Sequence, residues 1–302
     1  MAFKGAGGSA PAVLVAQGRL GYARAMEPLL RHIAACNNAR LPGERVAFRL
    51  GRDGAAVGWL GQPAASALAK LPGIAVDARG VHLAEPGGLT AVVRALADQG
   101  LLRLRGESFD VRAAPDGPVL ARIDRGALPV FGIIAVGVHV NGLVREPDGV
   151  RLWVGFRARD KHLDPGKLDH IVAGGVAAGM TPAQTLVKEA GEEAGIAADL
   201  ARRARPVATI GYAMQRAEGL RRDRLHCYDL DLPASFTPHP ADGEVERFEL
   251  WPVERALAEV RAGDAFKFNV NLVLIDLFLR LNMLPADQGA RLRAALAAQP
   301  GG

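Results

Sequence analysis

The sequence predicts an α/β protein built from two consecutive domains. At 302 residues the chain is longer than a typical single domain. Hydrophobic residues make up 49% and charged residues 23%, an ordinary balance for a globular protein with a buried core. The pattern also changes near residue 126, where short elements give way to long apolar strands. We therefore expect a domain over residues 1–125 and a second domain over residues 126–302.

The first 125 residues have the pattern of a small α+β domain. A helical spacing of apolar residues runs from Tyr22 to about Cys36. A hairpin is expected next, from VAFRL (46–50) and AAVGWL (55–60), because the turn Gly51-Arg52-Asp53-Gly54 lies between them. The other elements expected here are helices at 63–70 and 89–98, and short strands at 74–78, 101–105, 108–113 and 118–123.

Residues 126–302 carry longer elements. Two apolar strands, 131–144 and 151–158, are joined by the turn Pro147-Asp148-Gly149. A glycine-bearing loop and one strong helix follow from residue 174. The later elements are strands at about 206–214, 224–232 and 244–251, and helices at about 253–262, 268–283 and 286–298.

The distribution of charge limits the classes of partner that the chain is expected to bind. The formal charge is +5, and much of the excess lies in the arginine-rich segment 201–224. Few aromatic residues accompany these arginines, so a base-stacking surface is not expected, and we predict no nucleic-acid partner. A solvated basic face and attraction of an anionic small molecule both remain open.

Neither a membrane nor an oxidising compartment is indicated. No uninterrupted apolar run approaches the ~20 residues of a membrane helix. Residues 1–17 make a poor signal peptide and have the composition of a loosely attached leader. Cys36 and Cys227 lie far apart and match no zinc or CxxC spacing, which is typical of reduced thiols. The expected location is the cytoplasm.

The most informative segment is GGVAAGMTPAQTLVKEAGEEAGI, residues 174–196. Thr181 is a good N-cap and Pro182 suits the first helical position. Gln184 completes a capping box, and Gly195 supplies the C-terminal stop. A helix is therefore predicted between the two caps.

Three carboxylates share one arc of this helix. Glu189, Glu192 and Glu193 stand at i, i+3 and i+4, within one turn of each other. Crowded carboxylates repel, and a hard divalent cation such as Mg²⁺ removes the conflict because it prefers carboxylate and water oxygens. The loop Ala173-Gly174-Gly175 can bring backbone groups close to the same ion. From the spacing alone, a solvated acidic face is the alternative.

The same segment resembles the Nudix box, G-x5-E-x7-R-E-U-x-E-E-x-G-U, where U is a bulky aliphatic residue. The positions that match in register are Gly174, Glu189, Glu192, Glu193, Gly195 and Ile196. Met180 replaces the first Glu, Lys188 replaces the Arg, and Ala190 is smaller than usual. The resemblance implies an α/β/α sandwich with a mixed sheet, and Mg²⁺-dependent hydrolysis of a small-molecule diphosphate, with Mn²⁺ as an alternative cation.

The likeness extends to one subgroup, the thiamin-pyrophosphokinase-related Nudix hydrolases, which carry an N-terminal domain of unknown function. That subgroup implies hydrolysis of thiamin diphosphate, or its oxo and oxy analogues, to monophosphates. The stretches that carry the likeness are 30–42, 57–60, 137–145, 152–175, 228–233, 242–253 and 266–280. The first domain would then shape the substrate pocket or form a homodimer.

By resemblance, Glu192 and Glu193 ligate Mg²⁺, and Glu189 is a further ligand or orients the attacking water. A backbone carbonyl of Ala173 or Gly174 would complete part of the shell. Lys188 keeps the charge of the box Arg but lacks its planar fork.

Five further residues are candidates around this centre. Glu244 and Glu246 could act as the general base or bind a second metal, with ordinary strand-edge charges as the alternative. Arg157, Arg159 and Lys161 could hold the phosphates of the substrate, with exposed loop charges as the alternative.

Two histidines, His139 and His170, are expected to be structural, because no partner at metal-ligand spacing accompanies them. Three other functions compete with the one above. A pyrophosphatase for nucleotide sugars, ADP-ribose or dinucleotides shares the metal chemistry. A catalytically inert ligand-binding module is suggested by Met180 and Lys188. A diphosphate isomerase lacks a convincing thiol, since Cys227 lies in a strand pattern.

Overall fold

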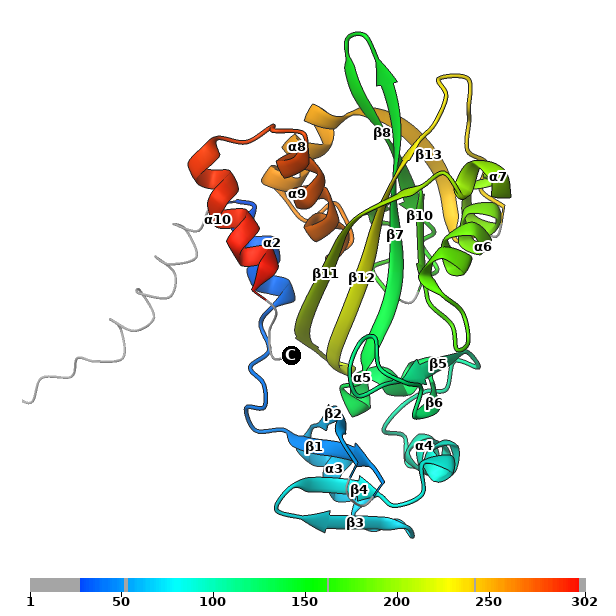
Figure 1. The fold of residues 1–302 in the computed structure, drawn as a ribbon, viewed down its shortest axis with the longest axis vertical. Coiled ribbons are helices and arrows are strands. Elements are labelled where there is room, and N and C mark those ends of the chain that lie inside the picture. The colour runs from blue at the N-terminus through cyan, green and yellow to red at the C-terminus, as the bar shows by residue number, and fades with distance from the viewer. Residues whose placement is uncertain (1–27, 52–53, 162, 242, 299–302) are drawn as a thin grey trace, which may run out of the picture.

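The computed structural model describes residues 28–51, 54–161, 163–241 and 243–298. A large twisted sheet with helices on both faces forms the upper part of the molecule in Figure 1, and a smaller α+β unit lies below it. The mixed α/β class and the small preceding α+β region predicted from the sequence are confirmed. The leader, residues 1–17, and the start of the helix predicted from Tyr22 lie outside the described residues.

The small unit is a four-stranded sheet, in the order β2-β1-β4-β3, with two helices and a separate hairpin, β5-β6. Its core is closed by large apolar side chains such as Phe48, Leu60 and Leu96, all fully buried. The elements are β1 (Val46–Leu50), β2 (Ala56–Leu60), α3 (Gln62–Leu68), β3 (Ile74–Asp77), β4 (Gly80–Leu83), α4 (Leu89–Asp98), β5 (Ser108–Val111) and β6 (Ala121–Asp124).

The large sheet has seven strands, with the main path β11-β12-β7-β8-β13, β10 paired to β7 and β9 paired to β8. The pair β12-β7 is parallel and the other pairs are antiparallel, so the sheet is mixed as predicted. The strands are β7 (Ile134–Glu146), β8 (Gly149–Arg157), β9 (Leu168–Asp169), β10 (Val172–Gly175), β11 (Arg205–Arg216), β12 (Gly219–Asp231) and β13 (Val245–Pro252).

Helices cover both faces of this sheet (Figure 1). On one face, α6 and α7 pack over Val138 and Val140 of β7. On the other face, α8, α9 and α10 pack over residues such as Leu143 of β7 and Leu152 of β8. Burial on both faces explains why β7 is a nearly continuous apolar run. The helices are α5 (Leu128–Phe131), α6 (Pro182–Ala194), α7 (Ala198–Ala201), α8 (Val253–Ala262), α9 (Val270–Arg280) and α10 (Ala286–Ala297).

The first described helix, α2 (Leu30–Cys36), packs on the large part of the molecule although the sequence groups it with the first domain. Ile33 and Cys36 are buried in the same core cluster as α9. The Nε2 of His32 lies 2.8 Å from the Val260 carbonyl oxygen, and Arg31 donates to the Gly263 carbonyl at 2.9 Å. The chain thus contacts the larger core both before and after the small unit.

Two further differences from the sequence-based expectation concern short elements. Residues 101–105 form no strand, because an alternating Leu/Arg pattern needs a partner strand, and none pairs with them in the described part of the chain. Strands β9 and β10 were not predicted: they are only 2 and 4 residues long and depend on pairing with β8 and β7.

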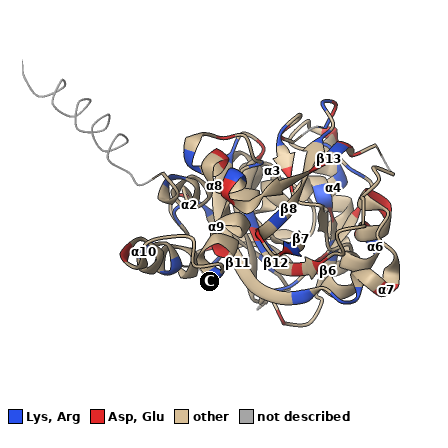
Figure 2. Ribbon diagram, turned by 90° about the horizontal axis from the view of Figure 1, so that it is seen from above, with Lys and Arg blue, Asp and Glu red and all other residues tan. Residues whose placement is uncertain are grey.

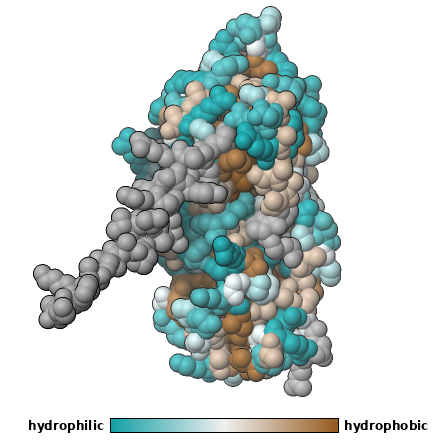
Figure 3. Space-filling model, turned by 90° about the vertical axis from the view of Figure 1, so that its left-hand side faces the viewer, coloured by the Kyte–Doolittle hydropathy of each residue, from teal (hydrophilic) through white to brown (hydrophobic). Residues whose placement is uncertain are grey.

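The surface charges are mixed. Figure 2 shows Lys and Arg interspersed with Asp and Glu. In the arginine-rich segment, Arg216 pairs with Asp164, Arg221 with Asp223 and Arg224 with Asp116. Figure 3 likewise shows hydrophobic patches broken up by hydrophilic ones on the face it presents. Among the described residues, no helix has the length and apolarity needed to cross a bilayer.

Candidate active site

Helix α6 begins and ends where its capping residues predict. The Thr181 hydroxyl accepts a hydrogen bond from the Gln184 backbone N–H at 3.2 Å, and the Gln184 side chain accepts from the Thr181 N–H at 2.9 Å. Gly195 ends the helix with φ of +65°. Leu186, Ala190 and Ala194 of α6 are buried in the core, and this rotation of the helix directs Glu189 and Glu193 toward strand β10.

Glu189 lies directly against the glycine that opens the segment. A Cβ atom on Gly174 would stand 2.5 Å from Cγ of Glu189, so only glycine leaves room for this side chain. The Glu189 side chain is 19% exposed. The absence of a side chain at Gly174 therefore lets a half-buried carboxylate reach the β10 backbone.

Glu193 lies deeper in the same place. It is 6% exposed, and one of its carboxylate oxygens accepts a hydrogen bond from the Ala173 N–H at 2.8 Å. The structure thus brings together four of the predicted metal-site positions, Glu189, Glu193, Ala173 and Gly174.

Glu192 is more exposed than these two carboxylates. Its side chain is half exposed and pairs with Lys188 at 2.5 Å. The same Lys188 ammonium lies 3.2 Å from Glu189. Lys188 therefore makes, from an exposed position, the kind of pairing expected of the box Arg, and an exposed pair of this kind is weak.

Burial makes the ionised forms of Glu189 and Glu193 unfavourable. Burial raises the pKa of Glu193 well above its ordinary value; the Ala173 N–H partly offsets this, and the charge of Asp169 raises the pKa further. Burial also raises the pKa of Glu189. Several carboxylates close together, with hard oxygen donors, fit a divalent cation such as Mg²⁺ or Mn²⁺, because the cation would relieve this repulsion.

Met180, which occupies the position of the first box Glu, is half-buried and packs against the apolar cluster under α6. Its N–H donates to the Ala177 carbonyl at 3.1 Å. The residue therefore contributes to packing of the loop before the helix, and its side chain adds no carboxylate to the site.

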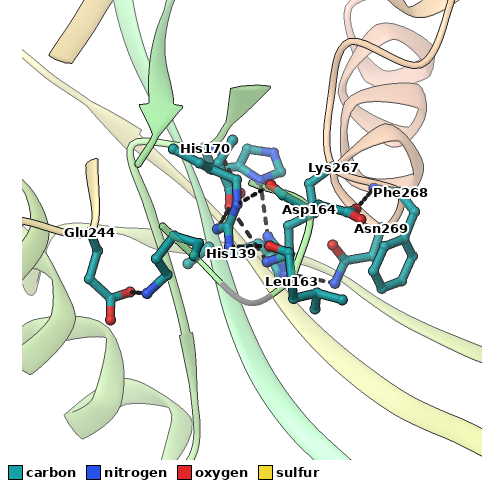
Figure 4. A network of polar contacts seen from close by, with 12 residues as sticks. His139, Leu163, Asp164, His170, Glu244, Lys267, Phe268 and Asn269 are labelled. Atoms are coloured by element: carbon teal, nitrogen blue, oxygen red, sulfur yellow. Dashed lines mark hydrogen bonds and ion pairs between the residues drawn. The ribbon is translucent and has the colours of Figure 1, made fainter. Parts of the chain in front are cut away.

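A buried polar network surrounds His139 and His170, and its members come from distant parts of the chain (Figure 4). His139, Asp169 and His170 are each at most 5% exposed, and one potential ligand atom from each lies within 4.8 Å of the others. The Nδ1 atoms of the two histidines are 3.0 Å apart. This grouping could not be predicted from the spacing, since 31 positions separate the histidines.

Two cations already face the acidic member of this network. Arg157 donates to Asp169 at 2.6 Å, and the Lys267 ammonium lies 3.5 Å from the same carboxylate. Burial by itself would raise the pKa of Asp169, but the charges of Lys267 and Arg157 outweigh it and hold that pKa well below its ordinary value. Burial lowers the pKa of both His139 and His170, so the rings are neutral. The charge balance favours a hydrogen-bonded network over a second metal centre.

Arg157 is accordingly engaged within the protein. Besides Asp169, its guanidinium donates to the Leu163 carbonyl at 2.8 Å and to the Asp164 carbonyl at 3.1 Å. Its side chain is only 11% exposed. The phosphate contact predicted for Arg157 would require breaking these bonds.

The other predicted residues lie around the edge of the site. Arg159 is exposed on the loop after β8, and Lys161 on the same loop pairs with Glu244 at 2.6 Å. Glu244 is near enough for its charge to raise the pKa of both Glu189 and Glu193. Glu246 is exposed at the irregularity between Val245 and Arg247, and no contact in the described residues joins it to the carboxylates.

Residues 136–270 match the family model described as the NUDIX domain. That range contains β10, α6 and the predicted metal-site positions. The mixed α/β architecture of this range and the placement of Glu189 and Glu193 beside β10 agree with the match to that family model.

Among curated proteins, the chain is 41% identical over 190 residues to Nudix hydrolase 20, chloroplastic, from Arabidopsis thaliana, covering 63% of this chain and 51% of that protein. It is 41% identical over 195 residues to Nudix hydrolase 24, chloroplastic, from the same plant, covering 64% and 53%. The chain thus spans about half the length of these relatives. A solved structure, DR0079 from Deinococcus radiodurans, is 24% identical with a TM-score of 0.43, covering 56% of this chain and 97% of that one.

Proposed function

We propose that this protein hydrolyses the phosphoanhydride bond of a small organic diphosphate to give a monophosphate, with a divalent cation bound at α6 and β10. The observation that carries the proposal is the placement of Glu189 and Glu193 against Ala173 and Gly174. The relatives named Nudix hydrolases support a hydrolytic reaction.

Glu189, Glu193 and a carbonyl of Ala173 or Gly174 would hold the cation. Glu192 would join them after leaving its exposed pair with Lys188. When bound, Mg²⁺ supplies a positive charge that offsets the charge of the leaving phosphate and makes a bound water more acidic. The other steps depend on side chains of this chain.

Residues at the edge of the site would bind the substrate phosphates and orient the attacking water. Arg159 and Lys161 lie on the loop after β8 and provide positive charge for an anionic substrate. Glu244, or Glu189 if it is not a metal ligand, would orient the water and accept its proton. Glu246 is a weaker candidate because it is exposed away from the carboxylates. Arg157 would act by holding the loop, through the Leu163 and Asp164 carbonyls.

The proposed substrate is thiamin diphosphate or one of its oxidised analogues. The support is the resemblance of the chain to the thiamin-pyrophosphokinase-related subgroup, which includes segments outside the box. The alternative is a nucleotide sugar, ADP-ribose or a dinucleotide, since these share the diphosphate and the metal chemistry. The cytoplasmic location and a homodimer remain predictions from the sequence.

The test is release of phosphate or monophosphate from a panel of diphosphates with Mg²⁺ or Mn²⁺. We expect thiamin-type substrates to have the highest kcat/KM and Glu193→Gln to abolish most of the rate. Glu254→Gln is the matched control, because it removes an exposed carboxylate of the same type on α8, outside the proposed site. Tight binding of a diphosphate with no turnover under any metal would overturn the proposal in favour of an inert binding module.

A further inference from the structure

We infer that the hairpin β5-β6 of the small unit is a positioning element of the metal site: it holds strand β10 from the side opposite α6. The inference rests on the proposed function, because it concerns the backbone that would bind the cation. It gives the first 125 residues a role in the metal chemistry itself.

The first observation is a close contact between the two parts of the chain. A Cβ atom on Gly175 would stand 2.7 Å from Cζ of Phe109, so the ring of Phe109 rests directly on the glycine backbone. Phe109 is 3% exposed and belongs to the core of the small unit. Gly175 follows Ala173 and Gly174 on β10, and the neighbouring Gly174 has the Glu189 side chain against it in the same manner.

The second observation is that β5 also holds the loop that joins β10 to α6. The Ala178 N–H donates to the Ser108 carbonyl at 2.8 Å. The Gly179 N–H donates to the Asp110 carboxylate at 3.3 Å. Three successive residues of β5 therefore contact the five-residue stretch from Gly175 to Gly179, two of them through hydrogen bonds and one through its ring.

The hairpin is itself well anchored. Phe109 is opposite Ile123 in the β5-β6 register. Asp124 accepts hydrogen bonds from the backbone N–H groups of Arg105, Gly106 and Gly126, which ties the two ends of the hairpin together. Figure 1 shows β5 and β6 below α6, at the lower end of the large sheet. Pairing with β7, the hairpin contact at Gly175 and the α6 side chains together define where the backbone of Ala173 and Gly174 lies.

If the hairpin positions the metal site, disturbing its contact with β10 should change the affinity for metal as well as the stability of the fold. If Phe109 positions the metal-binding backbone, crowding it at Gly175 should weaken metal binding, and relieving the crowding should restore it. Groups that orient metal ligands without touching the metal typically change affinity by about 10–100-fold. A contact that only holds the small unit in place would change the unfolding transition and leave the affinity for metal unaltered.

The experiment measures Mn²⁺ dissociation constants of the full chain by electron paramagnetic resonance, together with thermal unfolding. Gly175→Ala should weaken Mn²⁺ binding by about tenfold or more. Phe109→Leu combined with Gly175→Ala should bind Mn²⁺ more tightly than Gly175→Ala alone. Val111→Ala is the control, because Val111 is fully buried on the same strand and in the same cluster. It should lower the unfolding temperature and leave Mn²⁺ affinity unchanged.

The inference is overturned if Gly175→Ala binds Mn²⁺ like the unaltered protein, or if Val111→Ala weakens binding as much as Gly175→Ala. Should the Phe109 variant fail to fold, Asp110→Ala removes the acceptor of the Gly179 N–H and should weaken Mn²⁺ binding in the same direction. Failure of the proposed function gives a different result: the unaltered protein would then bind Mn²⁺ no better than Glu193→Gln.

Discussion

Arg157 and Asp169 form a buried ion pair, 2.6 Å between Nη1 and Oδ2, in which both side chains are almost completely shielded from solvent. Lys267 lies 3.5 Å from the same carboxylate. The two cations of this group would therefore be left without their counter-charge if the carboxylate were removed. Breaking a buried pair from one side is costly because the remaining charge stays buried.

Asp169→Asn should accordingly destabilise the protein by about 3–5 kcal/mol, measured by urea unfolding. Asp148→Asn is the control: Asp148 is 71% exposed and pairs with Arg151 at 3.4 Å. We expect the control to change stability by no more than about 0.5 kcal/mol. Equal effects of the two substitutions would show that the network near the histidines contributes nothing special to the fold.

Glu193→Gln should have opposite effects on stability and on activity. The folded state raises the pKa of Glu193, mainly through burial, so the folded protein binds this proton more tightly than the unfolded chain. Without metal, stability is then greatest below the ordinary carboxyl pKa and falls as pH rises toward the raised value. The Gln variant should lose this pH dependence and be at least as stable at neutral pH, while kcat falls by about 100-fold or more. Thermal unfolding between pH 4 and 8 (about the carboxyl-to-neutral range), with and without Mg²⁺, measures the first effect. A metal-free Gln variant that is less stable at every pH would contradict it.

Gly174→Ala should impair the site through Glu189. The added Cβ would meet Cγ of Glu189 at 2.5 Å, which forces the carboxylate or strand β10 to move. We expect a loss of about 1–3 kcal/mol in stability from overpacking, together with weaker Mn²⁺ binding. The matched control is Gly191→Ala in the exposed part of α6, where the nearest atom to the new Cβ, the Ile196 carbonyl oxygen, is 3.9 Å away. That substitution should stabilise the helix by up to about 1 kcal/mol. A loss of stability in both variants would contradict the prediction, because helix propensity and contact distance would then not explain the effects of alanine at these two positions.

Arg157→Ala and Arg159→Ala should separate a structural arginine from one that contacts substrate. Arg157 donates to two loop carbonyls and a buried carboxylate, so its loss should appear chiefly in the unfolding transition. Arg159 is exposed, and its loss should raise KM for the diphosphate with little change in stability. Steady-state kinetics and thermal unfolding of both variants check this assignment, and the reverse outcome would move the phosphate contact to Arg157.

Met180→Glu should leave kcat within about tenfold of the unaltered protein, because this side chain packs against the apolar cluster and not against the carboxylates. A far larger gain in rate would show that the natural residue holds the enzyme back, which would favour the binding-module alternative. The kinetic comparison should be made at saturating Mg²⁺, so that a change in metal affinity does not appear as a change in turnover.

The features that could be predicted from the sequence are those that depend on residues close together in the chain. The caps Thr181 and Gly195 specify helix α6, and the period of the helix places Glu189 and Glu193 on one arc. The motif also predicts that Gly174 is important. The physical reason, its close contact with Glu189, is visible only in the three-dimensional structure.

The rest depends on contacts between distant segments. The apolar pattern of α2 shows that the helix is buried but not that it packs against α9. The grouping of His139 with His170 arises from the pairing of β7 with β10 and the path of the chain between β9 and β10. The contact of Phe109 with Gly175 could not be predicted from composition or spacing. It joins two units of the chain, and the apolar pattern of each unit is already explained by its own core.

The position of α2 has a consequence for synthesis of the chain. The contact between His32 and Val260 closes 228 positions of sequence, and the small unit lies entirely within that interval. At about 5–20 residues per second, α2 waits on the order of 10–45 s at the ribosome before its partner helices exist. During that time the apolar side of α2 has no native surface to cover it, whereas the small unit can already complete its own core. Helices α8 to α10 are made after the small unit and then pack with α2, so the larger core can close only once they have been synthesised.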